Sequence, residues 1–257
     1  MAMLVDSHSH LDAAEFDDDR PAVLARAAAA GVARHILCAT DMHQWTKMHS
    51  VCAGAPGLHA AYGLHPTFLS LHRPEHIERL RERLSRERPV AVGECGLDYF
   101  VEGLDRGAQM DYFGAQLRLA REFDLPVVIH ARRAVDAVIA AIRRIGGLRG
   151  VVHSFPGSRQ QADQLFEQGF MLGFGGPVTY ERAQRLRRLV VEIPLEWMLL
   201  ETDSPDQPDA GIRGQRNEPA RLLQVLRTIA ELREADPAAI AAATSANAER
   251  LFGLPSA

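Results

Sequence analysis

Short apolar runs alternate with longer amphipathic stretches along the whole chain, and this alternation constrains the fold more than any other feature. Eight runs have the length and content of buried strands: 3–6, 34–39, 58–63, 90–94, 126–130, 150–154, 170–174 and 197–202. Stretches with helical periodicity separate and follow them: 20–30, 43–53, 74–87, 105–123, 132–145, 158–168, 180–191 and 217–234. Eight such units in 257 residues predict an α/β protein, a single-domain (β/α)8 TIM barrel over 1–257. An open doubly wound sheet is the alternative.

The C-terminal part of the chain continues beyond the eighth strand–helix unit. The stretch 203–219 is rich in Pro, Asp and Gly and predicts a long loop after the eighth strand. Asp236 and Pro237 have the residue types of an N-cap and a first helical residue, so an extra helix should begin there, followed by a last one over 245–252. The barrel should therefore carry a C-terminal helical extension.

Composition excludes several classes of protein. The chain has 29 Lys+Arg against 33 Asp+Glu, a net charge of −4, which excludes a broadly basic nucleic-acid binder. It is 47% hydrophobic, as expected of a globular protein. The N-terminus lacks the pattern of a secretory signal, and no apolar run approaches the ~18 residues of a membrane span. We expect a cytoplasmic protein that does not enter a membrane, and a monomer because no long apolar edge demands a partner.

Ionisable side chains follow six of the eight predicted strands. They are Asp6, His8 and His10 after the first, His65 after the third, Glu94 after the fourth, His130 after the fifth, His153 after the sixth and Asp203 after the eighth. In a barrel, the carboxyl ends of the strands meet at one mouth, where the active site lies. A cation compensates the desolvation and mutual repulsion of carboxylates and imidazoles gathered there. The pattern therefore predicts a metal site.

The number of candidate ligands bears on the number of ions. His8 and His10 are two residues apart on an extended chain, so both can point to the same ion. Four histidines and two carboxylates exceed what one tetrahedral ion takes. Two divalent ions about 3.5–4 Å apart, bridged by a carboxylate and a hydroxide, would use all six and suit the hydrolysis of a phosphoester. The mixed nitrogen and oxygen ligands leave Zn, Mn and Mg open.

Several motifs occur in register along nearly the whole chain: DSHSHLD, GLHP, GECGLDY, LPVVIHAR, GVVHSF, ETDSP and RNEP. Together they resemble the TatD-like metal-dependent hydrolase and deoxyribonuclease family of the amidohydrolase superfamily. The resemblance implies a (β/α)8 barrel with a two-metal centre. It also implies a phosphodiesterase or deoxyribonuclease activity, including 3′-5′ exonuclease action on single-stranded DNA.

The resemblance also implies a role for each candidate residue. The implied metal ligands are His8, His10 and Asp203 for one ion, His130 and His153 for the other, and Glu94 for both. His65 would lie on the substrate side and contact a phosphate, which makes it a catalytic candidate beside Glu94 and Asp203. Asp203 would also accept a proton from the attacking water. Asp98 would position a histidine or the substrate, or only pack.

The single lysine of the chain restricts which type of amidohydrolase-superfamily metal site is possible. Many members of the superfamily bridge their metals with a carbamylated lysine at the end of the fourth strand. Here the only lysine is Lys47, after the second strand, whereas the fourth strand ends in Glu94. This disfavours dihydroorotase-like and phosphotriesterase-like sites. The mononuclear deaminase pattern stays open, since it also uses HxH, later histidines and a final Asp.

The substrate is less constrained than the site. Asp206 and Asp209 place negative charge after the final strand, which disfavours a polyanion unless arginines offset it. Candidate arginines for this are Arg132, Arg213 and Arg216, since guanidinium binds phosphate bidentately. The arginines expected on solvated helix faces instead are Arg143, Arg144, Arg182, Arg185, Arg187 and Arg188.

Three functions remain after the sequence alone. The first is a dinuclear phosphodiesterase in which a metal-bound hydroxide attacks phosphorus. The second is an amide or ester hydrolase, or deacylase, using the same centre on a small or nucleotide-linked substrate. The third is a metal-loaded interaction protein without turnover, which the complete ligand set makes the weakest of the three.

Overall fold

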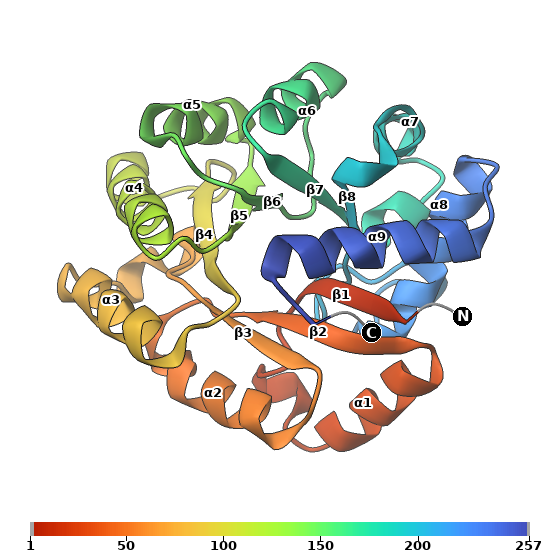
Figure 1. Ribbon diagram of the computed structural model, residues 1–257, viewed down its shortest axis with the longest axis horizontal. Helices are drawn as coiled ribbons and strands as arrows, with labels where there is room; N and C mark the ends of the chain where they lie inside the picture. The colour runs from red at the N-terminus through yellow and green to blue at the C-terminus, as the bar shows by residue number, and fades with distance from the viewer. Residues whose placement is uncertain (1–2, 256–257) are drawn as a thin grey trace.

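The computed structural model describes residues 3–255 and arranges the strands in one nearly closed ring (Figure 1). Every strand pairs in parallel with the next in chain order, from β1 to β8. The strands are β1 (Leu4–Ser9), β2 (Val32–Cys38), β3 (Leu58–Tyr62), β4 (Ala91–Asp98), β5 (Val127–Arg132), β6 (Gly150–Val152), β7 (Phe170–Phe174) and β8 (Met198–Leu200). The predicted (β/α)8 barrel is confirmed, and the open doubly wound sheet is wrong.

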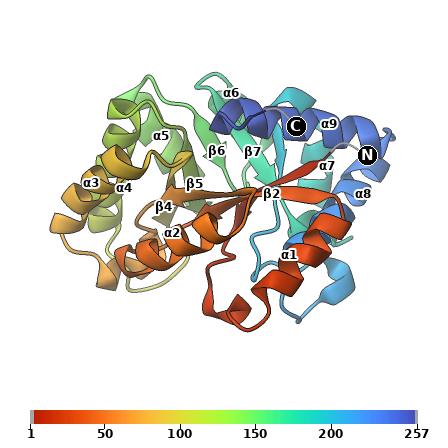
Figure 2. The ribbon, with the colours of Figure 1, turned by 60° about the horizontal axis from the view of Figure 1, so that its bottom comes forward.

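Helices surround this ring and cover its outer face, and the last of them crosses one end of the ring (Figures 1 and 2). They are α1 (Arg20–Ala29), α2 (Trp45–Gly54), α3 (Glu75–Glu87), α4 (Arg106–Glu122), α5 (Val135–Ile145), α6 (Arg159–Phe166), α7 (Gln184–Glu192), α8 (Leu222–Leu232) and α9 (Pro237–Phe252). Within residues 3–255, each helix is too short or too polar to span a bilayer.

The C-terminal extension differs in one respect from the sequence prediction. Two helices were expected after Asp236, but α9 runs without a break from Pro237 to Phe252. Asp236 caps it as predicted, accepting a hydrogen bond from the N–H of Ala238 at 2.9 Å. The segment between the two predicted helices is rich in Ala and contains no Gly or Pro, so nothing in it interrupts the helix. Thr244 donates its hydroxyl to the Ile240 carbonyl at 2.9 Å, within the helix itself.

The ring closes between β8 and β1 through a short seam. The N–H of Asp203 donates to the carbonyl of His8 at 2.9 Å, and the N–H of His10 donates to the carbonyl of Ser204 at 2.7 Å. The buried carboxylate of Asp6 accepts the N–H of Thr202 at 2.9 Å and its hydroxyl at 2.6 Å. Asp6 therefore serves to join the first strand to the last, rather than to line the mouth of the barrel.

The barrel interior is layered because alternate residues of each strand point inward. Val128, Val151, Met171 and Leu199 share one buried cluster with Leu251 and Phe252 of α9. The helix α9 thus seals the bottom of the barrel. Two residues further along the same strands, and on the same inward face, come the residues of the next layer: His130, His153, Gly173 and Glu201. This polar layer lies at the carboxyl ends of the strands, where the motifs of the sequence converge.

Candidate metal centre

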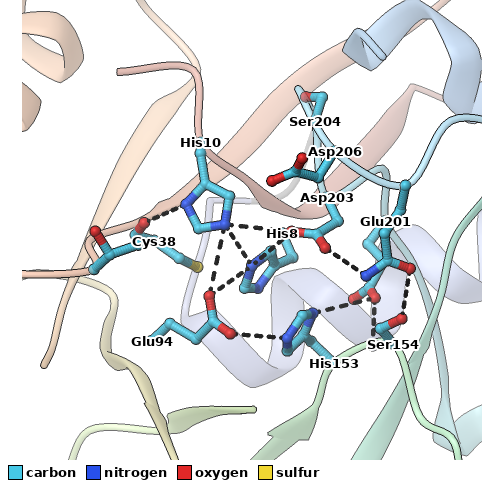
Figure 3. A network of polar contacts seen from close by, with 12 residues as sticks. His8, His10, Cys38, Glu94, His153, Ser154, Glu201, Asp203, Ser204 and Asp206 are labelled. Carbon is cyan, nitrogen blue, oxygen red and sulfur yellow. Dashed lines mark hydrogen bonds and ion pairs between the residues drawn. The ribbon is translucent and has the colours of Figure 1, made fainter. Parts of the chain in front are cut away.

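One group of ligand atoms joins the ends of β1 and β8 (Figure 3). The Nε2 atoms of His8 and His10 lie 3.3 Å apart. Asp203 Oδ1 lies 3.4 Å from the first and 3.3 Å from the second. Asp203 has φ = 55°, a left-handed conformation that is uncommon for a residue other than glycine. Its backbone N–H bonds to β1 and so holds this conformation at the seam.

A second group joins the ends of β3, β4, β5 and β6. Glu94 Oε1 lies 3.0 Å from His130 Nδ1, 2.9 Å from His153 Nε2 and 3.0 Å from His65 Nε2. His130 Nδ1 and His153 Nε2 are 3.3 Å apart. Glycine makes the close packing of β4 on β5 possible, because a Cβ at Gly96 would lie 2.0 Å from the carbonyl oxygen of His130.

Glu94 connects the two groups. While Oε1 faces the second group, Oε2 lies 3.1 Å from His8 Nε2 and 3.6 Å from His10 Nε2. The carboxylate is 2% exposed, so water can contribute little to its solvation. Burial alone would raise the pKa of Glu94, but the imidazoles of His65, His153 and His8 outweigh burial and hold this pKa well below its usual range. The geometry is that of a carboxylate with one oxygen toward each of two donor sets.

The donor set fits divalent cations. In each pair of imidazole nitrogens 3.3 Å apart, one ring is held by its far-side partner with a lone pair toward the site, and two lone pairs at that separation can both bind one ion. The site contains three groups of three residues, and within each group the potential ligand atoms lie within 4.8 Å of one another. The groups are His8, Glu94 and His153; His8, His10 and Asp203; and His65, Glu94 and His130. Nitrogen and carboxylate oxygen together suit zinc and manganese.

Two of the histidines are oriented by partners on their far side. His10 Nδ1 lies 2.8 Å from the carbonyl oxygen of Cys38, so this nitrogen donates and Nε2 offers its lone pair to the site. His130 Nε2 lies 3.0 Å from Asp98 Oδ2, which leaves the lone pair of Nδ1 directed at the site. Burial would raise the pKa of Asp98, but the hydrogen bonds from His130 and from the N–H groups of Val101 and Phe100 lower it to about 2. Asp98 thus positions a histidine.

In His65, unlike in His10 and His130, the ring nitrogen that faces the site carries the proton. Its Nδ1 accepts the backbone N–H of Thr67 at 3.2 Å, so Nε2 carries the proton and donates it to Glu94 Oε1. Burial lowers the pKa of His65 to about 4 and keeps the ring neutral at physiological pH. His65 therefore presents an N–H rather than a lone pair to the cavity, which distinguishes it from His10 and His130.

Glu201 is a site residue that the sequence interpretation missed. Glu201 directly follows β8 and is buried. Its Oε1 lies 3.7 Å from His153 Nδ1 and accepts a hydrogen bond from the N–H of Ser154. Its Oε2 has no hydrogen-bond partner within residues 3–255. The only sequence signal for it was a carboxylate at the end of an otherwise apolar run, Trp197 to Leu200, and that run was interpreted as a strand alone.

Gly173 explains how Glu201 reaches His153. β7 lies between β6, which leads to His153, and β8, which leads to Glu201. A Cβ at Gly173 would lie 2.0 Å from Glu201 Oε2 and 2.7 Å from its Cδ. The missing side chain therefore leaves the space through which a carboxylate from one strand crosses its neighbour to meet an imidazole on the next.

A pocket of about 760 Å³ opens above these residues. Asp203, Glu94, His10, His65, His130 and His153 all line it, whereas His8 is fully buried beneath. Arg132 also lines the pocket, and its guanidinium lies 3.7 Å from the ring centre of Phe100. On the other side the wall is acidic and includes Asp12, Glu15 and Asp206.

Two of the predicted substrate arginines lie elsewhere. Arg216 donates to both carboxylate oxygens of Asp19 at 2.9 and 2.7 Å, and its guanidinium covers the ring of Phe16. Neither Arg216 nor the exposed Arg213 lines the pocket. Their loop turns outward because Asn217 anchors its end, donating to the carbonyl groups of Thr202 and Asp206 at 2.8 Å each.

The two acidic residues predicted in the loop after β8, Asp206 and Asp209, have different surroundings. Asp206 lines the pocket as expected. Asp209 is 1% exposed and receives two hydrogen bonds from Arg221, at 2.6 and 2.8 Å, so its charge is neutralised away from the site. Lys47 lies on α2 and bonds Asp17 at 2.8 Å, which is consistent with the exclusion of a carbamylated lysine from the site.

Comparisons with known proteins agree with this geometry. The uncharacterized metal-dependent hydrolase YjjV of Escherichia coli K12 is 39% identical over 254 residues, covering 98% of this chain and 98% of that protein. The crystal structure of YjjV, described as a TatD homolog, matches with a TM-score of 0.93 at 38% identity and covers 98% of each chain. A Citrobacter rodentium protein named 3′-5′ ssDNA/RNA exonuclease TatD is 36% identical over 252 residues, covering 95% of this chain and 96% of that protein.

The family model of TatD-related DNases matches residues 5–253. This range includes all six predicted metal ligands and all eight strands apart from Leu4, the first residue of β1. The chain therefore belongs to the TatD-related DNase family.

Proposed function

We propose that this chain is a dinuclear metal-dependent phosphodiesterase whose substrate is single-stranded nucleic acid. Membership of the family supports hydrolysis of an ester bond. A relative named as an exonuclease acting on single-stranded DNA and RNA supports the substrate class. The observation that carries the proposal is Glu94, whose two oxygens face two separate sets of histidine and aspartate ligand atoms.

The proposed ligands fall into two sets that share one residue. His8, His10 and Asp203 would hold one ion, His130 and His153 the other, and Glu94 both. Bound there, two divalent cations would activate water and neutralise the charge that develops on a phosphoryl group. Asp98 and the Cys38 carbonyl keep His130 and His10 in the tautomers that this requires.

Asp203 and His65 have the contacts that proton transfer and charge stabilisation need. Asp203 Oδ2 receives a hydrogen bond from Gln207, which leaves Oδ1 directed at the centre of the site as an acceptor for the proton of an attacking water. His65 Nε2–H faces the pocket beside Glu94 and can donate to a phosphoryl oxygen. Arg132 lines the same pocket and can bind a phosphate oxygen.

The test of this proposal is Glu94→Gln, which preserves the shape of the side chain and removes its charge. We expect metal-dependent hydrolysis of bis-p-nitrophenyl phosphate to fall by about 100-fold or more, because a neutral amide cannot bridge two cations. Elemental analysis should find two divalent ions per wild-type chain and fewer in the variant. Unchanged turnover by the pure variant would contradict the proposal, and one tightly held zinc in the wild type would favour a mononuclear deaminase-like enzyme.

A second candidate function is hydrolysis of an amide or ester on a small or nucleotide-linked substrate. The acidic wall formed by Asp12, Glu15 and Asp206 favours it, because these carboxylates repel a polyanion that approaches from their side. The products distinguish the two functions. Release of phosphate ends from an oligonucleotide supports the first, and release of an acid or amine with every phosphodiester intact supports the second.

A further inference from the structure

The pocket of about 760 Å³ that the candidate metal ligands line is called the metal-centre pocket. A second pocket, of about 600 Å³, lies beside it. Its walls come from the loop after β6, the loop after β7 and the first turns of α7, and we call it the α7 pocket. It shares Ser154 and Pro156 with the metal-centre pocket, so the two are adjacent openings at one mouth of the barrel. Pro156, Pro177 and Leu186 contribute an apolar surface to it.

Three arginines line the α7 pocket: Arg182, Arg185 and Arg188. Spaced three residues apart, Arg185 and Arg188 lie on one face of α7, and Arg182 precedes the helix. All three are exposed, which agrees with the sequence expectation, but they gather over a cavity rather than scatter on a solvated face. Among residues 3–255 no carboxylate forms a salt bridge with any of them, whereas Arg159, Arg216 and Arg221 are each paired.

Charge is therefore distributed unevenly around the mouth. Asp12, Glu15 and Asp206 lie on the side of β1 and β8, and the unpaired arginines lie on the side of α7. A polyanion with one phosphate at the metal centre would be repelled by the first side and attracted to the second. The net charge of −4 makes this local field more important, because the molecule as a whole does not attract nucleic acid.

The chemistry of the α7 pocket suits a strand of nucleotides. Guanidinium groups bind phosphate oxygens in pairs, and proline and leucine surfaces contact bases without selecting a sequence. We propose that the α7 pocket binds the nucleotides next to the scissile phosphodiester, with Arg182, Arg185 and Arg188 on their phosphates. The single strand then crosses the loops after β6 and β7 and leaves the mouth along α7. This inference rests on the proposed function and adds the path of the substrate to it.

The test compares two double variants with the same change in net charge. R185E/R188E reverses the charge of the α7 pocket, and R86E/R227E reverses two exposed arginines of α3 and α8 that line neither pocket. The probe is a fluorescein-labelled, phosphorothioate-linked dT12, and its binding to each metal-loaded protein is measured by fluorescence anisotropy. We expect R185E/R188E to raise Kd about tenfold or more over wild type, and R86E/R227E to change it less than twofold.

Further measurements separate binding from damage to the fold. Charge-conserving R185K/R188K should recover most of the affinity, and the slope of log Kd against log salt should fall by about 1.4 in R185E/R188E, as two lost phosphate contacts predict. On cleavable dT12 the loss should appear mainly in KM rather than in kcat. Equal Kd values for the two double variants, or no binding of the probe by wild type, would overturn the inference.

The same experiment distinguishes this inference from the proposed function. Turnover of bis-p-nitrophenyl phosphate by wild type depends on the metal centre and needs no neighbouring nucleotide. If wild type lacks this turnover but R185E/R188E alone loses affinity for dT12, then the phosphodiesterase proposal fails and the binding site stands. If turnover is present and the two double variants bind dT12 equally, then the binding site fails and the phosphodiesterase stands.

Discussion

Contacts on the far side of the imidazole ring set the orientation of two proposed metal ligands, His10 and His130. His10 and His130 each use a different ring nitrogen for the site, because a carbonyl oxygen holds the first ring and a carboxylate holds the second. Glu201 Oε1 lies 3.7 Å from His153 Nδ1, and the absence of a side chain at Gly173 leaves the space that Glu201 occupies. A glycine is thus required here for the space it leaves rather than for its backbone conformation.

This dependence predicts the effect of changing Glu201 or Gly173. Glu201→Gln removes the charge that faces His153, and Gly173→Ala displaces the same side chain with its Cβ. We expect each variant to bind the more weakly held metal about 10–100-fold less tightly, measured by competition with a chelating dye. Because both changes act through one contact, the double variant should lose little more than either single one.

Glu196→Gln serves as the matched control, since Glu196 is exposed before β8 and faces no ligand. It should bind metal as wild type does. Additive losses in Gly173→Ala/Glu201→Gln would show that the two residues do not act through the same contact.

At the scale of elements, the seam between β8 and β1 determines whether one ligand group forms at all. His8 and His10 come from β1, and Asp203 comes from the residues after β8, so their meeting requires the ring to close. β8 is only three residues long, and the Asp6 carboxylate supplements its backbone pairing by binding Thr202. Thr202, which joins the end of β8 to β1 through Asp6, directly precedes the proposed ligand Asp203.

Thr202→Val tests the seam. Valine has nearly the shape of threonine but leaves Asp6 Oδ2 without a hydrogen-bond donor in a fully buried position. We expect the free energy of unfolding, measured with urea on metal-free protein, to fall by about 1–3 kcal/mol. Thr202→Ser keeps the hydroxyl and should retain most of this stability. Equal stability of the valine and serine variants would show that the hydroxyl contributes nothing to the seam.

For the whole molecule, the metal centre links stability to pH. In the metal-free protein burial alone would lower the pKa of His10, but Asp203 and Glu94 outweigh burial and raise this pKa from 6.5 to about 9. The stability contributed by protonated His10 is thus fully present below pH 6.5 and is lost as the pH rises through about 9. Metal must displace this proton, so metal affinity increases over the same interval.

The resulting prediction concerns the difference in melting temperature between metal-loaded and chelator-treated protein. We expect this difference to increase from pH 6.5 to pH 9, because the metal-free form loses stability while the metal competes with fewer protons. Differential scanning fluorimetry at several pH values in this interval measures it directly. A difference that stays constant or shrinks as the pH rises would contradict this linkage.

Much of the fold and the composition of the site followed from the sequence, because both are encoded locally. Apolar periodicity distinguishes strands from helices, and the carboxyl ends of barrel strands meet at one mouth whatever the loops do. For this reason the sequence predicts that His8, His10, Glu94, His130, His153 and Asp203 meet at one place, and the structure brings these six residues together. The continuous α9 was missed because an Ala-rich segment without a breaker carries no signal of where a helix should end.

Contacts between distant segments were decided only by the tertiary structure. Glu201 reaches His153 across Gly173 because strand order and inward alternation place three separate motifs side by side, which no single motif encodes. The path of the loop that Asn217 anchors turned Arg216 toward Asp19, and the placement of α7 brought Arg185 and Arg188 over a pocket. The sequence by itself determined the barrel and the convergence of its candidate ligands, whereas the three-dimensional packing determined their orientation and the charge around the mouth.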